Sequence, residues 1–206
     1  MALPNMDTQA KISSEAAQNF VDSFYEALNR RRPMGNYYAS TSPRLTSAGV
    51  KPDISINGLA LADVAAYEAL LETQGAPVTY DVASFDAQPV NPNFQQGAGG
   101  PADGNPAAAA AAAVRAGDRL SFALQVSGTV RYGRGHVASS SDKNHGPAVS
   151  AAPAVGTTDT SGGGGGAQEK LFNESFLLVP HWEAWGRNAP RNMRKWVIVS
   201  QNFRAL

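Results

Sequence analysis

The sequence predicts an α+β fold, in which helices cover one face of a curved antiparallel sheet. Two periodicities support this class. Apolar residues recur at spacings of three and four in the first third of the chain, and from Pro77 onward they alternate with polar residues. The order of these patterns is the third observation, because helices followed by a run of long strands are typical of α+β domains.

An apolar stripe predicts a first helix from Ser13 to Arg32, with Ser13 or Ser14 as its cap. The stripe consists of Ala17, Val21, Phe24, Tyr25 and Leu28. A second helix is expected from Leu61 to Thr73, ended by Gly75. Between the helices, Leu45–Ala48 and Asp53–Ile56 are compatible with β-structure, and the turn sequence Asn57-Gly58 predicts a small hairpin.

Alternating residues predict the strands of the sheet. The first begins at Val78, and the clearest runs from Arg119 to Tyr132, where Gly128 suggests a bulge or bend. Two more are expected at Lys170–Val179 and Trp196–Phe203. The prediction is one domain over residues 1–206, with flexible insertions at about 91–117 and 133–168 that are rich in Gly, Ala and Pro. The alanine run after Pro106 favours a marginal helix inside the first insertion.

The composition restricts the function classes. Lys+Arg and Asp+Glu both number 17, so no overall field attracts nucleic acid or an anionic membrane. The chain has no cysteine, which excludes disulfides and thiolate metal sites and fits a nuclear or cytosolic location. No apolar stretch is long enough for a membrane span, so neither a membrane nor a secretory route is expected.

Common catalytic and binding signatures are missing. The glycine run Gly162–Gly166 lacks the lysine and flanking elements of a phosphate-binding loop, and the histidines lack the spacing of metal ligands. Asp86 is the one acid that could be a general base, although a carboxylate at a strand end more often organises a turn. Arg187, Arg191, Arg194 and Lys195 lack interleaved aromatic residues, which favours a solvated loop over RNA contact.

The last strand carries apolar residues on both faces. Val197, Val199 and Phe203 share one parity, whereas Trp196 and Ile198 share the other. A sheet with helices on one side normally turns a polar face to water, so a second apolar face indicates a protein partner. The alternative is that the two insertions fold back over this face.

Particular residues resemble the nuclear transport factor 2-like family, and within it the small subunits of heterodimeric mRNA export receptors, especially the fungal type with long insertions. The resemblance rests on four co-linear motifs: Leu28-Asn29-Arg30-Arg31-Arg32, Asp86-Ala87-Gln88-Pro89-Val90, Phe172-Asn173-Glu174-Ser175-Phe176-Leu177-Leu178, and Trp196-Val197 through Asn202-Phe203-Arg204. They cover roughly residues 14–90, 119–132 and 170–206.

The resemblance implies a cone-like fold whose outer sheet face pairs with the related domain of a larger subunit. It implies a heterodimer that carries messenger ribonucleoprotein, and in fungi preribosomal particles, from the nucleus through the nuclear pore by binding phenylalanine-glycine nucleoporins. Arg204 would form an ion pair with an acid of the partner. The expected partner-binding residues are Trp196, Ile198, Ser200, Asn202 and Arg204 on the last strand, and Gln125, Ser127 and Thr129 on the long strand.

The same resemblance leaves an enzymatic alternative. Ketosteroid-isomerase-like enzymes share the fold and place acids and tyrosines inside the cone, where Asp86 or Tyr80 could serve. The interpretation preferred here is a protein without catalytic activity, cofactor, metal or small-molecule substrate. Contact with RNA or preribosomes through the region 133–168 and the loop before Trp196 stays a possibility, whereas binding of the Ran GTPase is not expected because that region has few acids.

Overall fold

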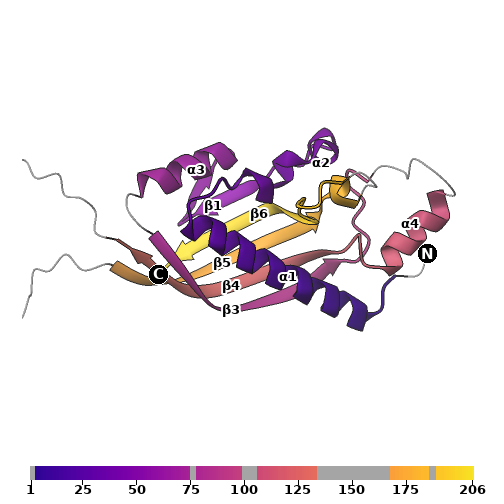
Figure 1. Cartoon of the computed structure of the whole chain (residues 1–206), viewed down its shortest axis with the longest axis horizontal. Coiled ribbons are helices and arrows are strands. Elements are labelled where there is room, and N and C mark those ends of the chain that lie inside the picture. The colour runs from indigo at the N-terminus through magenta and orange to yellow at the C-terminus, as the bar shows by residue number, and fades with distance from the viewer. Residues whose placement is uncertain (1–2, 75–77, 99–105, 134–167, 186–188) are drawn as a thin grey trace, which may run out of the picture.

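The computed structural model describes residues 3–74, 78–98, 106–133, 168–185 and 189–206. Its centre is a six-stranded sheet in the order β2-β1-β6-β5-β4-β3, with α1 lying across one face (Figure 1). The α+β class is confirmed. The sheet is mixed rather than purely antiparallel as predicted. Strand β1 pairs in parallel with β6, and all other neighbouring strands pair antiparallel.

The elements follow the predicted order. The helices are α1 (Met6–Asn29), α2 (Pro43–Ser47), α3 (Val64–Thr73) and α4 (Pro106–Arg115), with short 3-10 turns η1 (Gly35–Tyr37), η2 (Ala39–Thr41) and η3 (Trp182–Trp185). The strands are β1 (Asp53–Ile56), β2 (Leu59–Leu61), β3 (Val78–Asn91), β4 (Ser121–Tyr132), β5 (Gln168–Pro180) and β6 (Trp196–Ala205).

Three local predictions were wrong. Leu61, the expected first residue of the second helix, lies in β2, and α3 begins at Val64 because Asp63 caps it. Helix α1 begins seven residues before Ser13, because the side chain of Asn5 accepts a hydrogen bond from the Thr8 amide and caps the helix there. Leu45 lies in α2 rather than in a strand, since Ser42 caps that helix and Pro43 follows at its first position. The alanine-rich helix of the first insertion is present as α4.

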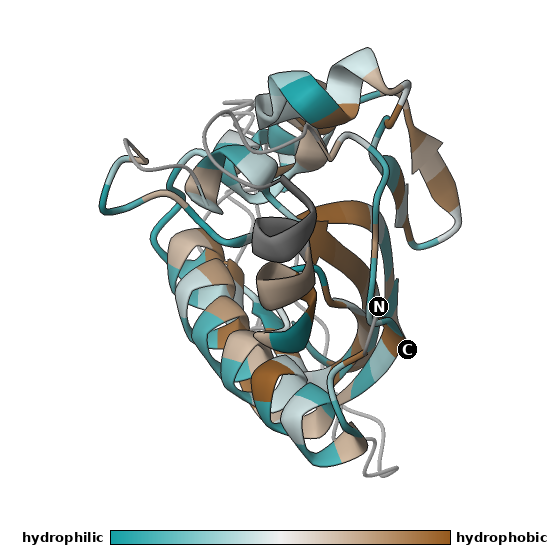
Figure 2. Ribbon diagram, turned by 90° about the vertical axis from the view of Figure 1, so that its right-hand side faces the viewer, coloured by the Kyte–Doolittle hydropathy of each residue, from teal (hydrophilic) through white to brown (hydrophobic). Residues whose placement is uncertain are grey.

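The main core lies between α1 and the sheet. Phe20 and Phe24 of α1 pack against Phe176 of β5, with ring centroids 5.2 Å apart in both cases. Figure 2 shows hydrophilic and hydrophobic residues side by side along the helices, as expected for helices that bury one stripe. The remaining core residues come mainly from the inward face of β3–β6.

Gly128 has a different role from the predicted bulge. Strand β4 pairs with β5 without interruption through Gly128, and the bulge lies opposite, at Ala83 of β3. A Cβ atom on Gly128 would lie 2.0 Å from the Asp81 carbonyl oxygen. The glycine therefore allows the bulged strand to approach β4 closely.

The predicted hairpin turn is confirmed at Asn57-Gly58, whose φ angles are 51° and 88°. Two consecutive positive φ values are typical of a type I′ turn. The turn also extends the pairing with β6, because the Asn57 amide donates to the Phe203 carbonyl (2.8 Å) and the Asn57 side chain accepts from the Ala205 amide (2.8 Å).

Replacement of Gly128 by alanine is expected to lower the free energy of unfolding by about 1–3 kcal/mol, because the added methyl group overlaps backbone that cannot move without breaking β3–β4 pairing. Urea denaturation measures this change. Gly35→Ala is the matched control, since a Cβ atom there meets nothing within 4 Å. Equal stability of the two variants would contradict this account of Gly128.

Candidate partner-binding face of the sheet

A bulge in β6 decides which of its residues face outward. Leu177 pairs with Ser200, but the next residue, Leu178, pairs with Ile198, so Val199 is an extra residue in the strand. The strict alternation assumed in the sequence analysis is broken at this point. The residues before Val199 therefore face the side opposite to the one that simple parity predicts, whereas those after it keep their predicted side.

The bulge corrects two expected partner-binding residues. Ile198 is fully buried in the main core. Trp196 packs on the same side, with its ring 6.0 Å from that of Phe122 and its indole N–H donating to the Leu120 carbonyl (2.9 Å). Ile198 therefore belongs to the interior, and the half-buried Trp196 lies on the same, inward side of the sheet rather than on its outward face.

The other expected residues lie together on the outward face. Pairing sets Gln125 of β4 beside Ser175 of β5, which in turn lies beside Asn202 of β6. In the next row Ser127 pairs with Asn173 and Asn173 with Arg204. Ser200 and Thr129 extend the face at its two ends, through Leu177 and Leu171 respectively.

We call this surface the open face: Ala123, Gln125, Ser127 and Thr129 of β4, Leu171, Asn173, Ser175 and Leu177 of β5, and Ser200, Asn202 and Arg204 of β6. Every member is exposed or half-buried in the isolated chain. Those from β4 and β5 carry no charge, and Leu171 is 62% exposed. Neutral, small side chains with exposed leucines suit the core of a protein interface, where charged residues are depleted.

Arg204 is the one cation of the open face. Its guanidinium lies over the β1–β2 turn, where a Cβ atom on Gly58 would be 3.0 Å from Arg204 Nη1. No described carboxylate lies within ion-pairing distance of it. The side chain is exposed and available to an acid of another chain.

One end of the outward side is covered by the chain itself. Val179 and Val197 are buried in a second apolar cluster with Trp182, and Phe94 stacks on Trp182 with ring centroids 6.2 Å apart. Because Phe94 belongs to the range 91–117, part of the first insertion does cover apolar residues of the last strands. Val197 was correctly expected to be buried, but in this second cluster. Residues 134–167 lie outside the described residues.

The inward side holds a buried polar network that the sequence analysis did not single out. Tyr25 donates to Glu174 (2.5 Å), Gln201 donates to the other Glu174 oxygen (2.6 Å), and Tyr38 donates to Gln201 (2.5 Å). Burial raises the pKa of Glu174 to about 7, although both hydrogen bonds act in the opposite direction. The sequence could have indicated this buried acid, because Glu174 shares its side of the strand with the apolar residues Phe172 and Phe176.

The structure contradicts Asp86 as a cavity acid. Asp86 is exposed on the outward side of β3 and accepts a hydrogen bond from Gln88 (2.9 Å). Tyr80, the other residue that the enzymatic alternative named, is buried on the inward side of the sheet. The acid of the cone is Glu174, which Tyr25 and Gln201 enclose. The described residues contain no cluster of His, Cys, Asp and Glu that could hold a metal ion, and no described helix is long and apolar enough to cross a membrane.

Comparisons with known proteins bear on this arrangement. No family model and no curated protein matches the sequence. Among solved structures, the chain matches one from "Sac3N peptide bound to Mex67:Mtr2" with a TM-score of 0.67 and 27% identity, covering 94% of this chain and 99% of that one. The chain has the nuclear transport factor 2-like fold.

Two further matches agree. One is from a Chaetomium thermophilum Mex67 nuclear transport factor 2-like domain complexed with Mtr2, with a TM-score of 0.66, 27% identity and coverage of 94% and 98%. The other, Mtr2 itself, has a TM-score of 0.65, 24% identity and coverage of 94% and 99%, which supports the fold alone. The nuclear transport factor 2-like fold of this chain thus resembles chains that form two-protein complexes.

The buried acid predicts a pH dependence of this fold. A carboxyl whose pKa rises from 4.5 to about 7 on folding stabilises the native state fully below pH 4.5, and this contribution is lost as the pH rises to about 7. The loss amounts to about 3 kcal/mol. Glu174→Gln mimics the protonated form, so its free energy of unfolding is expected to exceed that of the natural chain progressively across this window.

Urea denaturation at several pH values between 4 and 8 measures the difference. Glu169→Gln is the matched control, because Glu169 is an exposed glutamate of the same strand that pairs with Arg131. A Glu174→Gln curve parallel to the natural one would show that Glu174 ionises equally in the folded and unfolded chains.

Proposed function

We propose that this chain is the small, non-enzymatic subunit of a heterodimeric nuclear export receptor, and that its open face binds the nuclear transport factor 2-like domain of a larger subunit. The main support for this proposal is the open face, which is extended and uncharged in its centre. No described element of the chain covers it. Its likeness to chains from Mex67:Mtr2 complexes supports a large subunit of the Mex67 type.

The geometry favours binding over catalysis. Neither the cavity beside Tyr80 at the end of α1 nor the groove between α1 and β3 has Glu174 among its lining residues. A general base needs contact with substrate, and Glu174 contacts Tyr25 and Gln201 instead. We therefore assign Glu174 to folding and propose no catalytic residue, cofactor or small-molecule substrate.

As a subunit of such a receptor, the chain would act in the nucleus and at the nuclear pore and shuttle to the cytoplasm. The heterodimer, rather than this chain alone, would bind phenylalanine-glycine nucleoporins and carry messenger ribonucleoprotein or preribosomal particles. These steps rest on the resemblance of the four sequence motifs. The first test is co-expression with a Mex67-type large subunit, from which we expect a stable one-to-one complex; separate elution of the two chains would refute the pairing.

Arg204 provides a sharper test of the face. Arg204→Glu is expected to weaken the heterodimer by about 2–5 kcal/mol, because reversal leaves an acid of the partner facing another acid in a desolvated site. Isothermal titration calorimetry with the large-subunit domain measures the dissociation constant. Arg115→Glu is the matched control, since Arg115 is an exposed arginine of α4. An unchanged constant for Arg204→Glu would remove Arg204 from the interface.

A second candidate function, contact with RNA, is favoured by a separate observation. Arg194 lies 3.6 Å from the centre of the Tyr37 ring, Lys195 lies 4.7 Å from that of Trp185, and Arg119 lies 5.7 Å from that of Trp182. The aromatic partners that the sequence around Lys195 lacks thus come from other segments. The rings hold cations rather than bases, so such contact would be with phosphates.

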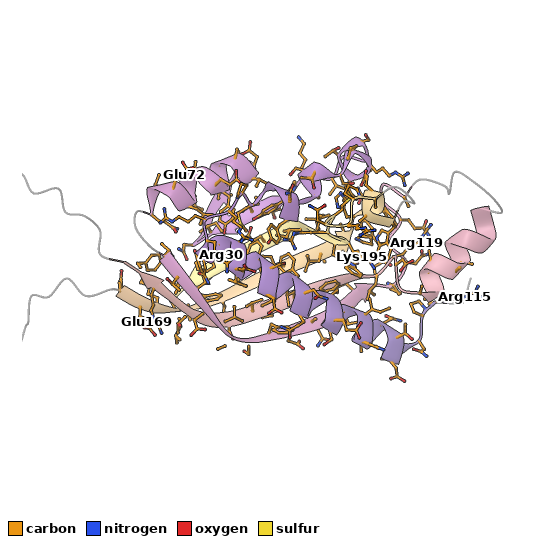
Figure 3. The ribbon with its side chains drawn as sticks, viewed as in Figure 1. Arg30, Glu72, Arg115, Arg119, Glu169 and Lys195 are labelled. Carbon is orange, nitrogen blue, oxygen red and sulfur yellow. The ribbon has the colours of Figure 1, made fainter. Side chains whose placement is uncertain are left out.

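The charge distribution agrees with this candidate. None of the described carboxylates forms an ion pair with Arg119, Arg194 or Lys195. Figure 3 shows Arg115, Arg119 and Lys195 toward one end of the molecule, and Arg30, Glu72 and Glu169 toward the other. In this overall neutral chain, the cations Arg119, Arg194 and Lys195 thus outnumber Asp118, the nearby carboxylate with which Lys195 interacts.

If these cations bind RNA, the double variant Arg119→Gln/Lys195→Gln should reduce the slope of log affinity against log salt concentration by about 2, because each lost cation releases one counterion fewer. Fluorescence anisotropy with a 20-nucleotide single-stranded RNA measures the slope. Arg30→Gln is the control, since Arg30 pairs with Glu26 (2.8 Å). Absent or salt-independent binding would exclude this function.

A further inference from the structure

Strand β3 forms one edge of the sheet and is unusually long for an edge, with 14 residues. Figure 1 shows it as the outermost strand, on the opposite side of the sheet from β1. Long edges carry unpaired backbone groups that another extended chain can bind. The side chains around this edge indicate which chain would fit.

Asn29 already takes the place of a neighbouring strand at one position. Its side-chain oxygen accepts from the Tyr80 amide (2.7 Å), and its side-chain nitrogen donates to the Tyr80 carbonyl (2.9 Å). A paired strand would make the same two hydrogen bonds. The backbone groups of Tyr80 therefore point away from β4, toward the free edge.

The edge continues beyond this cap. In a strand, side chains that share a face have backbone groups that point to the same side. Phe85 and Ala87 pack on the inward face like Tyr80, so their N–H and C=O groups also point to the free edge. Among the described residues, no element pairs with β3 on that side. Phe85 and Ala87 thus offer a short stretch of open ladder next to the position that Asn29 closes.

A groove accompanies this edge on the helix side. A cavity of about 400 Å³ lies between α1 and β3, beside Tyr80 and Val82. Val21 and Val82 form its apolar lining, and its polar lining includes Asp22, Asn29 and the ion pair of Glu26 with Arg30 (2.8 Å). An added strand would direct every second side chain toward this groove. Those side chains should be apolar.

The opposite side of the edge is acidic. Asp81 and Asp86 are exposed on the outward face of β3, together with the neutral residues Thr79, Ser84 and Gln88. If two copies of this chain paired antiparallel along the open ladder at Phe85 and Ala87, Asp86 of one copy would lie opposite Asp86 of the other. The charges therefore oppose self-association and favour a strand with basic side chains.

We propose that the free edge of β3 binds an extended peptide segment whose side chains alternate between apolar and basic, as an added antiparallel strand. Apolar side chains lie toward the α1 groove, and basic side chains meet Asp81 and Asp86. Backbone pairing with Phe85 and Ala87 provides affinity, and the alternation provides specificity. This site adjoins the open face, because Asp81 pairs with Thr129 and Asp86 with Gln125, and it is tested on the chain alone, without the proposed heterodimer.

The test uses the full chain and three end-capped decapeptides labelled with a fluorophore: alternating valine and lysine, alternating valine and glutamate, and a scrambled valine–lysine sequence. Anisotropy titrations should show binding of the alternating lysine peptide at least about tenfold tighter than of the others. Hydrogen exchange should slow at the Phe85 and Ala87 amides when it binds. Equal binding of the three peptides, or unchanged exchange at these amides, would overturn the proposal.

Variants locate the site. The double variant Asp81→Lys/Asp86→Lys should invert the preference between lysine and glutamate peptides, whereas Glu72→Lys, at an exposed acid of α3, should leave it unchanged. Ala87→Pro removes one free N–H without removing a hydrogen bond to β4, and should weaken binding of the lysine peptide. Unaltered preference in the double variant, with the sheet intact by circular dichroism, would show that the peptide binds elsewhere.

Discussion

The bulge at Val199 determines which residues of β6 face the open side of the sheet, and the proposed binding function depends on this arrangement. By inserting one residue into β6, it turns Trp196 and Ile198 toward the helices while Ser200, Asn202 and Arg204 stay on the outward side. A regular strand would have exposed either the large apolar pair or the Gln201 side chain. The bulge lets one short strand satisfy two requirements: a closed apolar core at its start and a polar, neutral surface at its end.

The same strand is held in register from both sides by polar contacts. Gln201 connects Glu174 of β5 with Tyr38, and Asn57 bonds the backbone of β6 at Phe203 and Ala205. Buried networks of this kind stabilise only when every member has its partner, because an unpaired buried polar group is costly. The network therefore opposes slippage of β6, which would move Arg204 off the open face and place Gln201 where no partner exists.

The sequence predicted the class, the strand order along the chain and the hairpin turn at Asn57-Gly58, because these follow from local periodicity and turn chemistry. It could not predict the Val199 bulge, since an extra residue leaves composition and spacing unchanged and appears only in the pairing with Leu177 and Leu178. Gly128 was recognised as unusual and interpreted as a bulge or bend of its own strand, whereas the bulge lies in β3 and the glycine makes room for the Asp81 backbone. The parallel pairing of β1 with β6 is likewise a long-range property.

Electrostatics separates the surfaces of this neutral chain. The open face has no charge at its centre and one cation, Arg204, at its margin, so a partner must match it mainly in shape and in one acid. The outward side of β3 has Asp81 and Asp86, and around Lys195 the cations form no ion pair with a described carboxylate, although Asp118 interacts with Lys195 at longer range. The acidic surface adjoins the open face, so a partner that covers Thr129 and Gln125 would lie beside Asp81 and Asp86, which pair with them.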